Sequence, residues 1–178
     1  PNPMVGCVIV YNEIIIGESY HKAYGLAHAE VNAIAAVQDP SLLPKATLYV
    51  NLEPCSHQGK TPPCADLIVR KKIKRVVIGG MDPNEKVNGA GIKRLLKNGI
   101  DVRINVLQEA CLKLNKRFYT FHQKKRPYYI LKWAQTSNGF IFSKNENQNI
   151  SNQLSNQKVH QIRAMEQAIL IGKNTLMV

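Results

Sequence analysis

Short β-branched runs alternate with helix-like segments over the first two thirds of the chain. Residues 5–10 and 14–19 are such runs, and the short polar connection between them predicts a β-hairpin. Residues 28–37 have the pattern of a helix, and residues 47–52 that of a buried strand. This strand leads directly into Glu53-Pro54-Cys55, so polar and reactive side chains follow its carboxyl end.

The alternation continues to about residue 121. Pro62-Pro63 is expected to open a helix that extends to about residue 71. Further on, the pattern predicts strands over 75–78 and 100–106 and helices over 91–97 and 109–121. Strands that alternate with helices in this way are typical of a layered α/β domain.

A second unit is expected after a polar, basic stretch that ends in proline, residues 122–127, which we interpret as a linker. The pattern predicts strands over 128–133 and 168–171, a helix through Met165, and a polar surface loop and helix start in the Asn- and Gln-rich stretch before it. The sequence thus predicts one domain over residues 1–121 and a second, incomplete one over 128–178, which is too short to close its own core.

Length and composition narrow the classes of protein. The chain has 178 residues, of which 44% are hydrophobic, and its apolar runs are far shorter than the roughly 20 residues of a membrane helix. We therefore expect no membrane span and no signal peptide. The chain begins at Pro1 and stops at Val178, and we expect both ends to be cut, with the first helix of the domain missing.

The formal net charge is +12. A charge of this size suits nucleic acid, an anionic surface or a phosphorylated small molecule as partner, and equally a basic, well-solvated surface without a special partner. Four cysteines are present. Two of them stand in metal-ligand order, so a reducing, cytoplasmic compartment is expected, while Cys7 and Cys111 are interpreted as buried small hydrophobic residues.

The strongest chemical signal is the order His28, Glu30, Cys55 and Cys64. A catalytic zinc site of the deaminase type needs one His and two Cys ligands, an open fourth position for water, and a Glu that moves protons without binding the metal. His28 and Glu30 stand two residues apart and cannot share a side face of a helix, so both are expected to act from its first turn.

The expected role of Glu30 follows from the two thiolates, which neutralise the charge of the zinc. Water then still needs a base, and the same carboxyl group can afterwards return a proton to the leaving amine. The alternative is a structural zinc, but such sites usually have four protein ligands, and the Glu would then be unexplained.

Eight residues separate the two cysteines, where the usual deaminase signature has two. The string EPCSHQGKTPPC, with PNPMVGC and HAEVNAI before it, closely resembles the deaminase domain of the bifunctional riboflavin-biosynthesis deaminase/reductase family. DPNEKVNGAGI and LNKRF also match, so the resemblance covers residues 1 to about 121.

This resemblance implies a cytidine-deaminase-like three-layer α/β domain with a central mixed sheet. It also implies that zinc serves the hydrolysis of the ring amine of a diamino-ribosylamino-pyrimidinone 5′-phosphate, which yields the aminouracil phosphate. The family's substrate residues correspond here to Asn2, His21, His57, Lys60 and Thr61. Lys60, Thr61 and a His57 cation would also suit a ribose phosphate on chemical grounds, although Gly59-Lys60-Thr61 equally has the composition of a generic polar loop.

From Arg126 onward, RPYYILKWAQTSNGFI and AILIGKNT resemble the start of the family's reductase domain, which is dihydrofolate-reductase-like and uses NADPH. Ala134 and Thr175 would then lie along the NADPH site, or are ordinary strand and turn residues. Asn138 and Asn149 stand where the family usually has Asp and Trp, and most of the domain is absent. The resemblance therefore implies NADPH-dependent reduction for the full-length protein rather than for this chain.

Two other functions are left open by the residues. One is a zinc deaminase that acts on a nucleic-acid base, which the charge favours and the long inter-cysteine loop opposes. The other is a basic binding module with a structural zinc. We expect a small phosphorylated pyrimidine as partner, without nucleic acid or membrane, and the sequence leaves homo-oligomerisation open.

Overall fold

The computed structural model describes residues 2–58, 62–84, 87–141 and 150–177. The chain forms two compact units, Pro1–Tyr128 and Tyr129–Val178. None of the described helices combines the length and the apolar character that crossing a membrane requires.

A five-stranded mixed sheet forms the centre of the first unit, with strand order β2-β1-β3-β4-β5. β1 pairs antiparallel with both of its neighbours, whereas β3, β4 and β5 are parallel to one another. The strands are β1 (Gly6–Tyr11), β2 (Ile14–Tyr20), β3 (Thr47–Val50), β4 (Arg75–Ile78) and β5 (Asp101–Arg103). The predicted hairpin is confirmed, and Asn12 and Glu13 form its turn with φ of 48° and 64°, as the right-handed twist of two paired strands favours.

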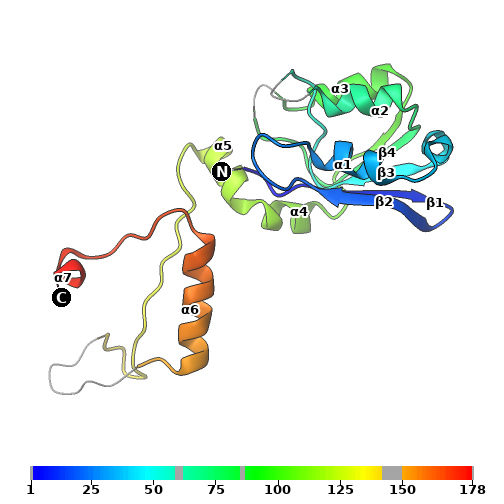
Figure 1. Cartoon of the computed structure of the whole chain (residues 1–178). Helices are drawn as coiled ribbons and strands as arrows, with labels where there is room; N and C mark the ends of the chain where they lie inside the picture. Colours follow the sequence, from blue (N-terminus) through cyan, green and yellow to red (C-terminus); the bar gives the residue numbers. More distant parts are fainter. Residues whose placement is uncertain (1, 59–61, 85–86, 142–149, 178) are drawn as a thin grey trace. The chain divides into compact units, whose positions relative to one another are not determined.

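Helices cover the sheet. Figure 1 shows α2 and α3 on one side of the sheet and α4 on the other, which gives the three layers. The helices are α1 (Ala29–Ala36), α2 (Cys64–Arg70), α3 (Ala90–Lys97), α4 (Gln108–Leu114) and α5 (Lys116–Lys124), with a short 3₁₀ helix over Pro40–Lys45. The parallel part of the sheet follows from the crossovers through α2 and α3, which bring β3, β4 and β5 into register.

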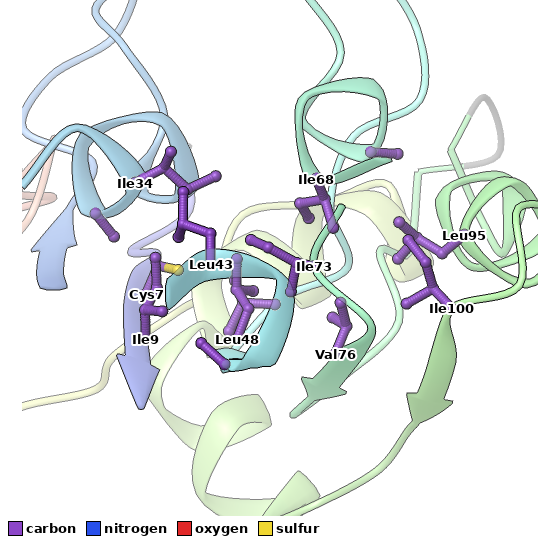
Figure 2. Close-up of a cluster of buried hydrophobic side chains, with 14 of the residues drawn as sticks. Cys7, Ile9, Ile34, Leu43, Leu48, Ile68, Ile73, Val76, Leu95 and Ile100 are labelled. Carbon is purple, nitrogen blue, oxygen red and sulfur yellow. The ribbon is translucent and has the colours of Figure 1, made fainter. Parts of the chain in front are cut away.

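The main core lies between the sheet and helices α1 to α3. Inward-facing strand residues such as Ile9 and Leu48 pack against Ile34, Ile68 and Leu95 from the three helices. Figure 2 shows these side chains as members of one buried cluster. A smaller cluster at the strand ends joins Leu52 to Phe118 and Tyr119 of α5.

The last helix of this unit differs from its prediction in two ways. The single helix expected over residues 109–121 is divided into α4 and α5, which meet at Asn115. The Asn115 amide group pairs with the backbone of Met4 in both directions, at 2.8 and 2.9 Å, so this position is fixed by a distant segment. In addition, α5 extends to Lys124 and so enters the stretch interpreted as a linker.

The second unit contains α6 (Gln153–Met165) and α7 (Lys173–Leu176). α6 has the predicted end, and the Asn152 side chain caps its start by accepting a hydrogen bond from the Ser155 N–H at 2.8 Å. The strands predicted over 128–133 and 168–171 are wrong, because these residues are irregular and pair with no neighbour in the described part of the unit. Their apolar side chains stay exposed, at 83% for Leu131 and 99% for Leu170.

Candidate metal centre

Two helix starts and one strand end place the centre. His28 is the N-cap of α1 with extended backbone, and Glu30 lies in the first turn of that helix. Cys64 is the first residue of α2 and follows Pro63. Cys55 comes five residues after the end of β3, beyond Glu53-Pro54. His28 and Glu30 thus both lie at the helix start, as their spacing predicted.

The three expected ligands lie together in space. One nitrogen of His28 and the sulfur atoms of Cys55 and Cys64 all lie within 4.8 Å of one another. His28 Nδ1 is 3.5 Å from Cys55 Sγ and 3.3 Å from Cys64 Sγ. Zn–N bonds of about 2.0 Å and Zn–S bonds of about 2.3 Å at tetrahedral angles separate N from S by about 3.5 Å. The arrangement therefore fits a tetrahedral zinc ion.

No fourth His, Cys, Asp or Glu joins this group within the part of the chain that the structure describes. Three protein ligands and one open position are typical of catalytic zinc, whereas structural zinc usually has four protein ligands. The donor set therefore favours a site at which water or substrate can reach the metal.

The two thiols differ strongly in acidity. A hydrogen bond from the Cys64 thiol lowers the pKa of Cys55 to about 4, and the His28 side chain and the Cys64 backbone N–H, 3.3 Å from Cys55 Sγ, add to this effect. The same hydrogen bond, together with burial and nearby negative charge, raises the pKa of Cys64. A second thiolate here therefore requires a cation, and a zinc dication held by His28, Cys55 and Cys64 would supply that charge.

Glu30 lies beside the ligands and is only 3% exposed. Burial raises the pKa of its carboxyl group to about 7, and the neighbouring Cys55 adds to the rise while His28 opposes it. A carboxyl group with a pKa near neutrality can both accept and return a proton at physiological pH.

Three of the five residues predicted to bind the substrate lie within the described part of the chain. The His21 ring stands edge-on to the His28 ring, with centroids 5.4 Å apart, and its Nδ1 lies 3.1 Å from the Ala27 carbonyl oxygen. Asn2 and His57 are exposed, and His57 belongs to the loop between the cysteines. Lys60 and Thr61 lie outside the described residues.

The two residues predicted for NADPH both belong to the second unit. Ala134 is half-buried in an irregular segment, and Thr175 lies in α7. The NADPH site stays a prediction.

One residue of this region was missed by sequence reasoning. Glu53 is 4% exposed, and its carboxylate accepts hydrogen bonds from backbone N–H groups at the start of α3. Its only signal in the sequence is an acidic residue directly between a buried strand and a predicted ligand.

Comparison with known proteins agrees with this geometry. Residues 1–80 match the family described as "Cytidine and deoxycytidylate deaminase zinc-binding region". The chain is 43% identical over 178 residues to the riboflavin biosynthesis protein RibD of Actinobacillus pleuropneumoniae, which covers 99% of the chain and 47% of that protein. It is 49% identical over 119 residues to a diaminohydroxyphosphoribosylamino-pyrimidine deaminase of Buchnera aphidicola, covering 67% of the chain and 80% of that deaminase.

Solved structures lead to the same group. The deaminase/reductase of Thermotoga maritima matches with a TM-score of 0.91 and 43% identity, over 99% of this chain and 51% of that one. One form of RibD from Acinetobacter baumannii matches with a TM-score of 0.89 and 37% identity, over 99% and 49%.

The fold and the His-Cys-Cys centre thus define a zinc deaminase of the cytidine-deaminase-like class. Within that class, the chain belongs to the family of diaminohydroxyphosphoribosylaminopyrimidine deaminases of riboflavin biosynthesis. The resemblance and the fold predicted from it are confirmed. The chain spans about half the length of the curated RibD relatives that it matches.

Proposed function

We propose that this chain catalyses the zinc-dependent hydrolytic deamination of a diamino-ribosylamino-pyrimidinone 5′-phosphate to the corresponding aminouracil phosphate. The observation that carries the proposal is the buried Glu30 carboxyl group beside three converging ligand atoms, which no fourth protein ligand joins among the described residues. The 49% identity to a deaminase named for this substrate supports the choice of substrate.

His28, Cys55 and Cys64 would hold the zinc ion, which when bound would lower the pKa of a water molecule at its fourth position. The Glu30 carboxylate accepts a proton from the attacking water as its oxygen bonds to the ring carbon that bears the amine. The resulting carboxylic acid then returns this proton to the amine, and the C–N bond breaks to release ammonia. Burial favours this cycle because it brings the pKa of Glu30 to about 7.

Five further residues are proposed to bind the substrate: Asn2, His21, His57, Lys60 and Thr61. Contact between the rings of His21 and His28 supports a place for His21 beside the metal. Lys60 and Thr61 have the charge and hydrogen-bonding groups for the phosphate, and they belong to the loop that the two cysteine ligands enclose.

The cellular setting is also a proposal. None of the four cysteines forms a disulfide, which supports the proposal of a reducing, cytoplasmic compartment. We further propose that the second unit is the beginning of a reductase domain, which in a longer protein would bind NADPH near Ala134 and Thr175. This assignment is supported by the match of 99% of the chain, second unit included, to RibD relatives at 39–43% identity and to the deaminase/reductase of Thermotoga maritima.

Substitution of Glu30 by Gln tests the proposed chemistry. Gln has nearly the same shape but cannot carry the proton, so turnover should fall by about 10²–10⁴-fold while the zinc content stays unchanged. Ammonia release and metal analysis measure the two quantities. Glu18→Gln, which alters an exposed carboxylate on β2, is the matched control and should keep full activity. A Glu30→Gln variant that retains most of its turnover would refute the assignment of the proton shuttle.

A further inference from the structure

Glu53 is a buried carboxylate without a side-chain cation among its contacts in the described residues, and backbone N–H groups take that place. Oε1 accepts hydrogen bonds from Gly91 at 2.9 Å and Ile92 at 3.3 Å. Oε2 accepts from Gly89 at 2.9 Å and from Asp82 at 3.2 Å. Three of these four donors belong to the N-cap and first turn of α3, where the helix dipole also favours a negative charge.

The backbone around Glu53 adds to this attachment. The Glu53 N–H donates to the Gly80 carbonyl oxygen at 2.9 Å, so main chain and side chain bind the same region after β4. Gly91 of α3 lies directly against the Pro54 carbonyl oxygen, and a Cβ atom at this position would collide with it. The start of α3 therefore holds Glu53 and Pro54 through contacts that leave little freedom.

Cys55, the next residue, is held by the other helix. The Ala65 N–H donates to the Cys55 carbonyl oxygen at 3.1 Å, and the Cys64 N–H donates to Cys55 Sγ at 3.3 Å. Figure 1 shows α2 and α3 side by side above the sheet. The segment Glu53-Pro54-Cys55 is thus fixed between two helix starts, with α3 holding its first part and α2 its last.

We propose that Glu53 is a positioning residue for the Cys55 ligand. Its two oxygen atoms are occupied by the four N–H groups, so it acts through the backbone of residues 53–55 and does not bind the metal itself. The consequence is that Glu53 raises the affinity of the centre for zinc by presenting Cys55 Sγ at the distance that His28 and Cys64 require. The proposal rests on the zinc centre of the proposed function but is independent of the substrate.

The test is the zinc affinity of Glu53→Gln, measured by chelator competition on the whole chain. The amide keeps one acceptor oxygen but turns an NH₂ group toward two N–H donors, so the segment should loosen. Outer-shell changes of this kind typically weaken metal binding by 10–100-fold, and we expect about this loss. Glu18→Gln is again the control and should bind zinc as tightly as the unaltered chain. Hydrogen exchange should quicken at the amides of Gly89, Gly91 and Ile92 and stay unchanged in β1.

Gly91→Ala provides an independent route to the same segment. Alanine normally stabilises a helix relative to glycine. Here the added Cβ should push Pro54 away, so zinc should bind at least about tenfold more weakly and the charge-transfer and d–d bands of the cobalt-substituted protein should shift. Zinc affinity within about threefold of the unaltered chain in folded Glu53→Gln and Gly91→Ala variants would overturn the proposal. Deamination by Glu30→Gln would instead contradict the proposed chemistry, so the two failures can be told apart.

Discussion

The two units of this chain carry similar hydrophobic runs but use them differently. In the first unit, β1 pairs with β2 on one side and β3 on the other, and its Ile9 is completely buried. In the second, the runs at 128–133 and 168–171 remain irregular and expose Leu131 and Leu170. A hydrophobic run therefore forms a strand only where its backbone N–H and C=O groups also find a neighbouring strand as hydrogen-bond partner.

The metal centre follows the same division. All four of its residues, His28, Glu30, Cys55 and Cys64, belong to the first unit, and each lies at or near the end of an element whose packing fixes it. The reactive side chains thus lie in the unit that has a buried core to hold them in place.

Limited proteolysis should show the largest difference between the units. Local opening of exposed, weakly packed segments costs almost nothing, whereas cleavage within a packed domain requires an opening that costs about 5 kcal/mol or more. Bonds within Tyr129–Val178 should therefore be cut at least about a thousandfold faster than those within β1 to β4. Mass spectrometry of timed digests measures both rates. Equal rates would mean that the first unit has no stable core of its own.

Truncation of one buried and one exposed side chain should give the next largest contrast. Ile9→Ala removes a completely buried side chain from β1 and should lower the free energy of unfolding by about 2–5 kcal/mol. Leu170→Ala should change it by less than about 0.5 kcal/mol, since Leu170 is fully accessible. Denaturant titration of the zinc-loaded chain checks both values. Similar losses in the two variants would contradict the difference in burial between the two units.

The smallest effect is expected on the basic surface of the first unit. Arg75 Nε and Asp101 Oδ2 form an ion pair at 3.0 Å, with both side chains about half exposed. Asp101→Asn should cost less than about 1 kcal/mol of unfolding free energy, and added salt should reduce the difference further. Thermal unfolding at low and high salt measures it. A larger loss that salt does not reduce would show that Asp101 stabilises this unit by something other than a solvent-screened surface ion pair.

The sequence predicted most elements of the first unit and all three residues of the ligand cluster, because local periodicity and spacing carry this information. It did not predict the division between α4 and α5, since the partner of Asn115 is Met4, 111 positions earlier. Glu53 was missed for the same reason, as its N–H donors lie 29 to 39 residues further along the chain. Contacts of this range depend on the completed fold.

The central claim is that zinc at this centre drives hydrolytic deamination. It is tested most directly by stripping the chain of metal, restoring Zn²⁺ in steps, and measuring the initial rate of ammonia release from the diamino-ribosylamino-pyrimidinone 5′-phosphate. We predict that the rate rises in proportion to bound zinc and levels off at about one zinc per chain. A rate independent of bound zinc, or no ammonia from the zinc-saturated chain, would contradict the account.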